Sequence, residues 1–538
     1  VKRDESMMPV RAKSRIVVLG NHEDREWTKS ERFAPVLRGD SLRFLVSMAV
    51  DARRVLKQGD CKNAFCQGVL PDDEVTIVRP PHGDPSAKRG EFWLLRKCLY
   101  GLRRSPRHWF KKVDGFLRSM GLTPNLYDPC VYSGFISDPN DPTDSPSPEP
   151  IVLGLYVDDF VYFSRSDEVE AKFERILAQL VQVEFMGVVD WFLGTQFTWR
   201  KDGPDVSCHL CQAGFARCLV EQFGRANKTQ SPDCTPYRSG LPIDSIPSAD
   251  QDDKSEAFLR RRDAYRSLVG SLGWLAMCTR PDLTPAHSFL ASYSHCPGPG
   301  HMKAAIHALH YVHSTHDFGI SFTSKETQPL HSYLHFPHKS EAEDYTDAVP
   351  PASPEERSRI STYSDACWGS QLGNSVPAGT PVEMFKFRSL SGAIVFRSSG
   401  PIAWKGERQD ETALSSCQAE IKATNEACKL TIATRNFSNG FVDRGVHLTD
   451  GDEPITVYND NEACVQWCHN MTSKGIRHME LRENATREWV LKGLLSVKHV
   501  AGKCNVSDIF TKEIRDKSLF RRLRDSFMSR LSDFVNIR

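Results

Sequence analysis

The sequence has no long apolar segment, because no stretch approaches the roughly 20 consecutive residues that a helix needs to cross a bilayer. We therefore expect a soluble protein with no membrane partner. An excess of charge of one sign is also missing, since 69 Lys and Arg residues face 68 Asp and Glu residues and the net charge is +1. No global field attracts nucleic acid, so contacts with phosphates have to come from local clusters. Two basic clusters are present, Arg103–Lys112 and Arg260–Arg262.

A disulfide framework is missing as well. The 16 cysteines are scattered, no apolar signal segment stands at Val1, and 538 residues can build more than one hydrophobic core without cross-links. We expect a reducing compartment and a protein that is not secreted. The spacing of Cys208-His209-Leu210-Cys211 is compatible with zinc, but no second ligand pair follows at a suitable distance and the segment alternates like a strand. We therefore assign no zinc site to it.

Two polar, proline-rich stretches divide the chain. Residues 137–150, which include Ser145-Pro146-Ser147-Pro148, are expected to form a surface loop inserted in a larger domain. Residues 323–359 are expected to be a linker, and the segment before it has apolar residues at helical spacing. Residues 516–538 are expected to be a basic tail or helix.

Two adjacent carboxylates lie between two apolar runs. Asp158 and Asp159 separate Ile151–Leu155 from Phe160–Phe163, a pattern that predicts a β-hairpin with both aspartates at its turn. Consecutive strand residues point to opposite faces, so the bend of a tight hairpin is needed to bring both carboxylates to one site. Such a pair is also common in plain solvated turns. Asp60 favours a metal site, since three carboxylates can hold the two divalent ions used in phosphoryl transfer.

The segments around these aspartates resemble the reverse transcriptases of copia-type LTR retrotransposons. The matching segments occur in the expected order, namely Lys13–Gly20, Phe33–Val36, Asp60–Gly68, Cys98–Trp109, Tyr127–Tyr132, Tyr156–Asp159 and Phe192–Gly194. The resemblance implies an α+β multidomain fold, in which a right-hand polymerase with fingers, palm and thumb precedes an α/β ribonuclease H-like domain. Residues 1–235 would then be fingers and palm, with truncated N-terminal fingers, and residues 236–322 a helical thumb and connection.

The resemblance also implies roles for individual residues. Asp60, Asp158 and Asp159 would be the catalytic metal ligands of the palm. Lys13 and Arg15 would contact the triphosphate of the incoming nucleotide, where cations neutralise developing charge. An exposed basic strand is the alternative for these two residues.

Further positions are implied around the substrate and the primer. Phe65 would exclude a 2′-hydroxyl and so select deoxynucleotides, unless it is an aromatic of the core. The other residues expected at the substrate are Tyr100, Gly101, Tyr156 and Val157. The primer grip would be Trp191, Phe192, Leu193 and Gly194. Apolar packing alone could also explain this last group.

A second set of carboxylates follows residue 360. Asp365 ends a strand-like run, Glu420 lies in a serine-capped helix with an alanine at every fourth position, Asp460 ends another strand, and Asp508 opens a helix. This order resembles the ribonuclease H domain of the same retrotransposon family, expected over residues 360–515. The resemblance implies two Mg²⁺ ions on these four carboxylates, or Mn²⁺ in their place, and cleavage of the RNA strand of an RNA–DNA hybrid. Asp508 could instead merely favour a helix N-terminus.

The leading hypothesis is an RNA-directed DNA polymerase with ribonuclease H activity, one piece of a Pol polyprotein that works with the integrase and coat protein of the same element. Its expected partners are an RNA template, a DNA primer, their hybrid and deoxynucleoside triphosphates. A cytoplasmic virus-like particle with passage to the nucleus is the expected location. One alternative is a catalytically inactive, transposon-derived nucleic-acid-binding protein, and another is a nuclease that has lost polymerisation. All seven proposed carboxylates are present, which argues against gross decay.

Overall fold

The computed structural model describes residues 2–3, 9–11, 14–23, 25–81, 83–84, 88, 90–223, 235–237, 248–249, 253–325, 360–369, 388–442, 446, 453–470, 483–512, 514 and 516–536. Its elements form a mixed α/β structure. Contacts divide the chain into one unit of Val1–Asp4, Met8–Val189 and Asn436–Leu448, and another of Glu5–Met7, Asp190–Arg435 and Thr449–Arg538. This division is coarser than the segments expected from the sequence. Lys13 and most of the expected linker lie outside the described residues.

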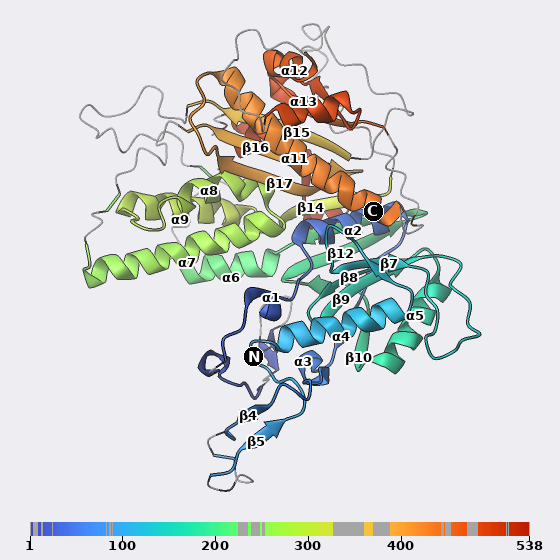
Figure 1. Cartoon of the computed structure of the whole chain (residues 1–538). Helices are drawn as coiled ribbons and strands as arrows, with labels where there is room; N and C mark the ends of the chain where they lie inside the picture. The colour runs from blue at the N-terminus through green and yellow to red at the C-terminus, as the bar shows by residue number, and fades with distance from the viewer. Residues whose placement is uncertain are drawn as a thin grey trace. The chain divides into compact units, whose positions relative to one another are not determined.

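Unit 1 is built on a six-stranded antiparallel sheet with the order β10-β3-β9-β8-β7-β6 (Figure 1). These strands are Val183–Val188, Lys57–Cys61, Asp159–Ser164, Ile151–Tyr156, Val131–Gly134 and Thr123–Pro124. Its main helices are α2 (Gly39–Asp51), α4 (Ser105–Ser119) and α5 (Asp167–Leu180).

The core of unit 1 explains why the two hairpin strands are apolar throughout. Ile151, Leu153 and Leu155 of β8 share one buried cluster with Trp109 of α4 and Phe173 of α5. The alternate position Gly154 faces α2, because a Cβ built there would lie 2.7 Å from Leu45. The sheet is therefore covered on both faces, and its central strands need no polar side.

The remaining elements of unit 1 are short. They are β1 (Lys2–Arg3), β2 (Pro9–Arg11), η1 (Gly20–His22), α1 (Lys29–Arg32), α3 (Ala64–Gln67), β4 (Thr76–Val78) and β5 (Trp93–Leu95). β4 and β5 pair as a hairpin that projects from the rest of the unit (Figure 1). The polar segment 137–150 connects β7 to β8, and ion pairs from Asp138 to Arg175 (3.3 Å) and from Asp144 to Lys172 (2.8 Å) fasten it to α5.

Unit 2 contains two five-stranded sheets. The first is antiparallel and has the order β11-β12-β13-β14-β20, with the strands Trp191–Phe192, Thr195–Asp202, Asp205–Cys211, Phe318–Thr323 and Met528–Arg530. The second has the order β17-β16-β15-β18-β19, with the strands Gly400–Arg408, Leu390–Arg397, Ile360–Cys367, Ile455–Asn459 and Leu495–His499. In the second sheet β17, β16 and β15 are antiparallel, whereas β15, β18 and β19 are parallel.

Helices of unit 2 precede and follow these strands. Those before the second sheet are α6 (Ala213–Phe223), α7 (Glu256–Cys278), η3 (Pro281–Leu283), α8 (Thr284–Ala291) and α9 (Pro299–Ser314). Those after its first strands are α11 (Ser416–Val442), α12 (Glu462–His469), α13 (Asn484–Leu491), η7 (Gly502–Cys504), η8 (Val506–Phe510), α14 (Lys517–Asp525) and α15 (Leu531–Asn536). The last residues of α11, from Asn436 on, are grouped with unit 1.

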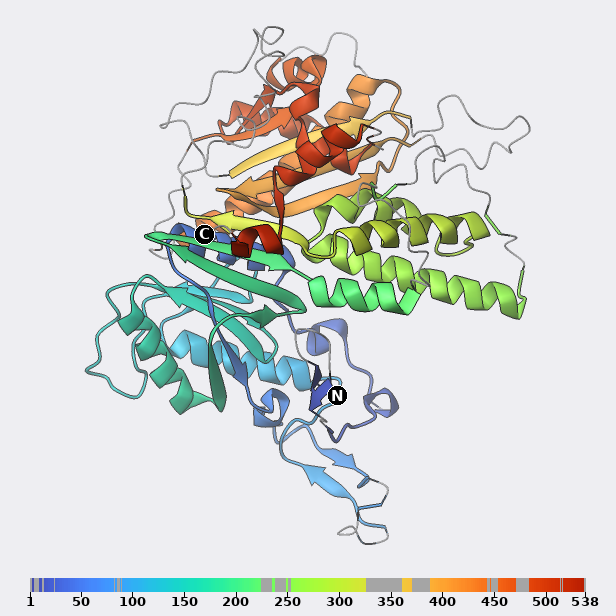
Figure 2. The ribbon, with the colours of Figure 1, turned by 180° about the vertical axis from the view of Figure 1, so that it is seen from behind.

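Two segments of unit 2 differ from their expected secondary structure. The region expected to be helical up to residue 322 ends in β14, where Phe318, Ile320 and Phe322 alternate as buried residues. The expected C-terminal tail contributes β20, which pairs with β14 at the edge of the first sheet (Figure 2). A strand of three residues is too short to show an alternating pattern, which is why the sequence did not reveal β20.

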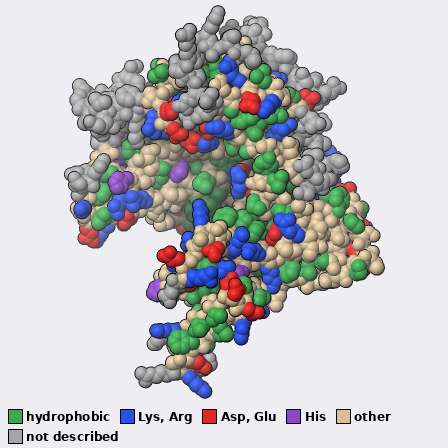
Figure 3. Space-filling model, viewed as in Figure 1, with side chains coloured by type: hydrophobic (Ala, Val, Ile, Leu, Met, Phe, Trp, Pro, Cys, Tyr) green, Lys and Arg blue, Asp and Glu red, His purple; other side chains and the backbone are tan. Residues whose placement is uncertain are grey.

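The surface reflects the balanced composition. Basic and acidic side chains are interspersed on the face shown in Figure 3, as a net charge of +1 would suggest. No helix in the described part of the chain is long and apolar enough to span a bilayer.

Candidate active sites

The predicted hairpin exists, and its turn is strained. β8 and β9 pair in antiparallel register up to Tyr156 and Asp159, which leaves Val157 and Asp158 as a two-residue turn. Val157 has a φ of +58°, a conformation that is unfavourable for a β-branched residue. The indole Nε1 of the buried Trp109 donates a hydrogen bond of 2.6 Å to the carbonyl of Val157. This bond from α4 holds the turn in its unusual conformation.

The third carboxylate of the first set lies beside this turn. β3 pairs with β9 so that Asp60 is directly opposite Asp159, a relationship that places two Cβ atoms about 5 Å apart. The next residue, Cys61, donates its backbone N–H to the carbonyl of Asp158 at 2.8 Å. Burial, and after it the charges of Asp60, Asp158 and Asp159, raise the pKa of the Cys61 thiol to about 12. All three carboxylates therefore lie close enough to the Cys61 thiol to raise its pKa.

These three carboxylates are arranged more loosely than the second set. Asp60, Asp158 and Asp159 do not converge as closely as 4.8 Å, the separation within which three ligand atoms of the described residues count as one group. Each is partly exposed to solvent. A cation held here would have to draw the side chains together or keep several water ligands, which Mg²⁺ commonly does.

Three of the expected substrate residues form a chain of contacts in unit 1. The guanidinium of Arg15 lies 4.8 Å from the ring centroid of Tyr100, and the rings of Tyr100 and Phe65 are 5.0 Å apart. Burial raises the pKa of Tyr100, and so does Asp158, while Arg15 lowers it. Phe65 is half-buried at the edge of the core around α4. It therefore packs as a core aromatic while keeping an exposed side.

The backbone conformation and the surroundings of Gly101 both require a glycine. Its φ is +95°, and a Cβ built there would lie 1.9 Å from the carbonyl oxygen of Val18. The segment before η1 runs against this loop, since Val18 donates its N–H to the carbonyl of Tyr100 at 2.8 Å. This close approach of two backbones requires a glycine, whether or not a ligand also approaches.

The residues expected to grip the primer lie in a different unit from the hairpin turn. Trp191 and Phe192 form β11, and Leu193 and Gly194, with φ of +49° and +76°, make the turn to β12. This group belongs to unit 2, whereas the turn at Val157 belongs to unit 1. Lys13 lies outside the described residues.

Part of the first basic cluster is engaged within unit 1. Arg104 forms an ion pair of 2.6 Å with Glu74, and the ring of His108 lies 3.1 Å from the same carboxylate. Lys112 donates to the carbonyl of Gln67 at 2.6 Å. These side chains hold the segment before β4 against α4, so they are less suited to phosphate binding than the sequence suggested.

The second set of carboxylates converges in unit 2. Asp365 lies on β15, Glu420 near the start of α11, and Asp460 directly after β18. One ligand oxygen from each lies within 4.8 Å of those of the other two. The alanines of α11 permit this approach, since Ala419 and Ala423 pack against Ala366 of β15. The convergence thus follows from the small-residue face that the sequence displays.

Asp508 adjoins the cluster through a lysine. The Lys512 ammonium lies 3.0 Å from Asp365 Oδ1 and 2.9 Å from Asp508 Oδ1, so one positive charge bridges the two carboxylates. Thr511 donates its hydroxyl to the other oxygen of Asp365. The helix expected around Asp508 is only the 3-10 turn η8. This short turn is enough to direct residues 508, 511 and 512 to the cluster.

Burial and mutual repulsion perturb these acids. Burial and the charge of Asp365 raise the pKa of Glu420 to about 9. Asn459 donates a hydrogen bond of 3.0 Å to the Glu420 carboxylate, and this bond lowers the pKa. Burial and Asp365 also raise the pKa of Asp508 to about 8, which Lys512 opposes, and they raise the pKa of Asp460. Such a group of oxygens with excess negative charge suits a hard divalent cation.

Sequence reasoning missed several residues that shape these sites. The sequence presents Trp109 only as the last residue of a matching segment, and it indicates no role for Asn459, Thr511 or Lys512. Lys512 carried a signal, because it lies four residues after Asp508 and such pairs meet on one side of a helical turn. The bond from Trp109 to Val157 joins residues 48 positions apart, and no local pattern encodes it.

Residues 1–237 match the family described as reverse transcriptase (RNA-dependent DNA polymerase). The chain is similar to the retrovirus-related Pol polyprotein from transposon TNT 1-94 of Nicotiana tabacum, with 25% identity over 96% of this chain and 34% of that protein. The Pol polyprotein from transposon RE2 of Arabidopsis thaliana is 27% identical over 94% of this chain and 30% of its own length.

The chain thus spans about a third of the length of these relatives. Among solved structures, a foamy viral protease-reverse transcriptase in complex with double-stranded DNA aligns with 88% of this chain and 61% of its own, at 10% identity. Its TM-score of 0.18 is too low to support a comparison of folds.

Proposed function

We propose that the chain is an RNA-directed DNA polymerase with ribonuclease H activity, because residues 1–237 match the reverse transcriptase family and the chain is similar to copia-type Pol polyproteins over 94–96% of its length. The fingers, palm and thumb of a right-hand polymerase would lie before residue 323, and the ribonuclease H-like domain would follow residue 359. The proposal includes two metal-dependent sites, one in each unit.

The observation that carries the polymerase proposal is the register of β3 and β9. It sets Asp60 opposite Asp159 at a hairpin tip that also holds Asp158. When bound there, two Mg²⁺ ions, or Mn²⁺ in their place, would activate the attacking 3′-oxygen and stabilise the leaving oxygen. The residues of the chain bind and orient these groups, and Val157 and Tyr156 place the aspartates.

The neighbouring side chains suit the incoming nucleotide. Arg15, together with Lys13, would neutralise the triphosphate, and Phe65 beside Tyr100 would limit the space at the 2′-position of the sugar. The turn at Leu193 and Gly194 would hold the primer end. RNA template, DNA primer and deoxynucleoside triphosphates are the corresponding partners.

The ribonuclease proposal rests on the cluster of Asp365, Glu420 and Asp460, with Asp508 beside it. Four carboxylates from separate elements would supply an all-oxygen site for two hard cations. Asp365 and Glu420 would hold the ions, and Asn459 would orient the Glu420 carboxylate. The substrate would be an RNA–DNA hybrid, bound through its phosphates and 2′-hydroxyls.

Primer extension on a poly-A RNA template with Mg²⁺ tests the polymerase. The double variant Asp158→Asn plus Asp159→Asn should lose incorporation by at least about a thousandfold, because both ligands are removed. The matched control is Asp72→Asn plus Asp73→Asn, a second Asp-Asp pair that lies in an exposed turn. Equal incorporation by the chain and the Asp158/Asp159 variant would eliminate the polymerase assignment and favour the inactive nucleic-acid-binding alternative.

The second site is tested separately by Glu420→Gln. This variant should abolish RNA cleavage in a hybrid and leave extension intact, whereas Glu426→Gln on the same helix should cleave normally. Glu426 is paired with Lys405 and Lys429, away from the three-carboxylate group. Loss of extension together with cleavage would contradict the proposed separation of the two sites. Within a Pol polyprotein, the integrase and coat protein of the same element would act on the DNA product and enclose the reaction in a particle.

A further inference from the structure

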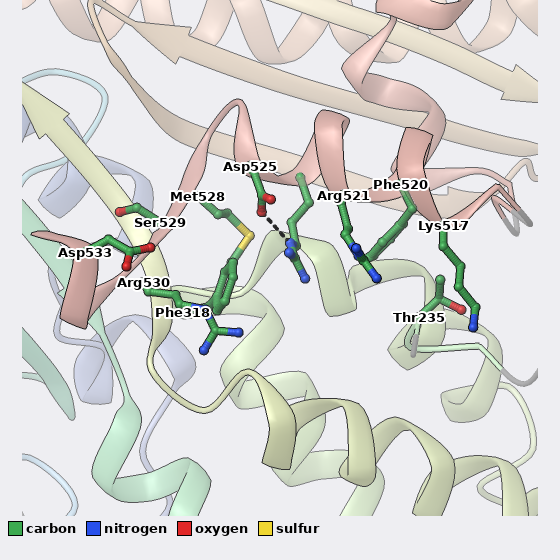
Figure 4. Close-up of a pocket in the computed structure, with 11 residues that line it drawn as sticks. Thr235, Phe318, Lys517, Phe520, Arg521, Asp525, Met528, Ser529, Arg530 and Asp533 are labelled. Atoms are coloured by element: carbon green, nitrogen blue, oxygen red, sulfur yellow. Dashed lines mark hydrogen bonds and ion pairs between the residues drawn. The ribbon is translucent and has the colours of Figure 1, made fainter. Parts of the chain in front are cut away.

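A cavity of about 420 Å³ lies in unit 2 beside α14 (Figure 4). Four of its lining side chains are cationic, namely Lys517, Arg521, Arg524 and Arg530, and two are acidic, Asp525 and Asp533. The lining therefore has an excess of two positive charges in a chain whose net charge is only +1. The cavity is separate from both sets of carboxylates.

The cations gather because of helix periodicity. Lys517, Arg521 and Arg524 are spaced by four and three residues, so they share one side of α14. Figure 4 shows Lys517 and Arg521 extending from that side of the helix. Arg530 comes from β20, which follows α14 directly. Two elements that the sequence presented as a basic tail thus build one basic surface.

The inner part of this surface is held in place. Arg524 is largely buried, donates to Asp525 at 2.7 Å and to the hydroxyl of Tyr311 at 3.2 Å, and lies 4.2 Å from the ring centroid of Phe318. Arg530 is paired with Asp317 at 3.1 Å and lies 4.7 Å from the same ring. A guanidinium has five N–H donors, so these contacts do not exhaust either group. An anion that enters meets donors that are already ordered.

The outer part is exposed. Lys517 and Arg521 lie in the exposed first turns of α14. Long cationic side chains at the rim of a cavity can close on an anion without loss of core packing. The helix itself begins shortly after Lys512, in the same segment that carries Asp508.

We propose that this cavity binds a phosphate of the nucleic-acid backbone that the chain holds. The inference rests on the proposed function in taking an RNA–DNA hybrid as the ligand. Guanidinium groups match phosphate oxygens in geometry, and ordered ones bind with little loss of side-chain entropy. The cationic lining side chains outnumber the acidic ones by four to two, so the contact acts through charge and is independent of sequence. The site fixes the hybrid on the unit that carries the second carboxylate cluster.

The test uses the full chain with Lys517→Ala plus Arg521→Ala. Fluorescence anisotropy with a labelled RNA–DNA hybrid is measured in EDTA, so that no cleavage interferes, at a series of salt concentrations. The variant should bind about tenfold more weakly at low salt, and the slope of log K against log salt should become less negative by about 1 to 2. The control Lys429→Ala plus Lys492→Ala removes the same charge from exposed ion pairs outside the cavity, and should bind as the unaltered chain does.

Three results would overturn the inference. They are unchanged binding by the variant, an equal loss in the control, and binding of inorganic phosphate that the variant loses while it holds the hybrid normally. The last result would assign the cavity to a small anion. The proposed function is tested separately. A chain that binds the hybrid through this cavity but neither extends a primer nor cleaves RNA would contradict the proposed function alone.

Discussion

Trp109 and Val157 are joined by a hydrogen bond of 2.6 Å from the indole Nε1 to the backbone carbonyl. The bond links a buried residue of α4 to the turn that carries the first pair of aspartates. A β-branched residue with a φ of +58° is costly, by about 1 to 3 kcal/mol, and persists only where its surroundings determine it. Trp109 is therefore a positioning residue for the hairpin.

Trp109→Phe should impair polymerisation more than folding. The phenyl ring keeps most of the packing but leaves the Val157 carbonyl without its donor, so we expect a loss of about 1 to 3 kcal/mol in stability. Displacement of the turn should lower primer extension by about tenfold or more, while RNA cleavage in unit 2 stays unchanged. The ratio of the two activities measures this, with Trp489→Phe on α13 as the control. A parallel fall in both activities would show that Trp109 acts only through stability.

Phe65→Val should relax the proposed selection against ribonucleotides. Phe65 and Phe110 are both partly buried against the same core, but only Phe65 also contacts Tyr100 near the proposed nucleotide site. We expect incorporation of a ribonucleotide relative to its deoxynucleotide to rise by about tenfold. Phe110→Val removes a similar volume and should leave this ratio unchanged. If both variants alter stability and neither alters the ratio, Phe65 is a core residue and nothing more.

The sequence predicted the local features of both sites better than their surroundings. The apolar runs gave the hairpin of β8 and β9, and the alanines of α11 indicated the helix that packs closely on β15. These patterns are local, so periodicity reveals them. Lys512 between two carboxylates and Trp109 behind the turn depend on tertiary packing, which no spacing encodes. β20 likewise pairs with β14, which lies about 200 residues earlier in the chain.

Arg280→Met should be strongly destabilising. Arg280 is buried and forms two bonds with the carboxylate of Asp282, at 3.0 and 2.8 Å, and Tyr311 donates to the same carboxylate at 2.6 Å. Removal of one partner leaves a buried charge, which costs about 3 to 5 kcal/mol. The double variant Arg280→Met plus Asp282→Leu should be less destabilised than the single variant, because both charges are then absent. Thermal unfolding compares them, and equal losses would mean that packing, not charge, sets the cost.

Lys512→Ala should make the stability of unit 2 depend on Mg²⁺. Lys512 is paired with Asp365 at 3.0 Å and with Asp508 at 2.9 Å, and its removal leaves the buried Asp365 without this cationic partner, at a cost of about 3 kcal/mol. A divalent cation would replace the missing charge, so the rise in melting temperature on addition of Mg²⁺ should be larger for the variant than for the unaltered chain. Lys429→Ala removes an exposed ion pair and should change neither value. An equal rise in all three proteins would show that Lys512 does not compete with the cation.

Binding of Mg²⁺ to the second cluster should strengthen as the pH rises toward 9. The pKa of Glu420 is raised to about 9 and that of Asp508 to about 8, chiefly by burial and then by Asp365, so both acids hold protons at neutral pH when no cation is bound. When no cation is bound, the raised pKa values of these two carboxyl groups stabilise the fold at low pH. This stability is lost as the pH rises from the ordinary pKa values of Glu and Asp through 8 and 9. A cation must displace the protons, so its affinity should increase by up to about tenfold per pH unit for each proton released.

Calorimetric titrations with Mg²⁺ at several pH values, in buffers of different ionisation enthalpy, count the protons released. Glu420→Gln should bind Mg²⁺ weakly and release fewer protons, because the amide neither ionises nor carries the charge that attracts the cation. Glu426→Gln, whose carboxylate is paired with Lys405 and Lys429, should match the unaltered chain. An affinity that stays constant between pH 6.5 and 9, a window set by the raised pKa values of about 8 and 9, would mean that these acids are ionised before the cation arrives. Lys512 would then already offset their charge, and burial would not control access to the site.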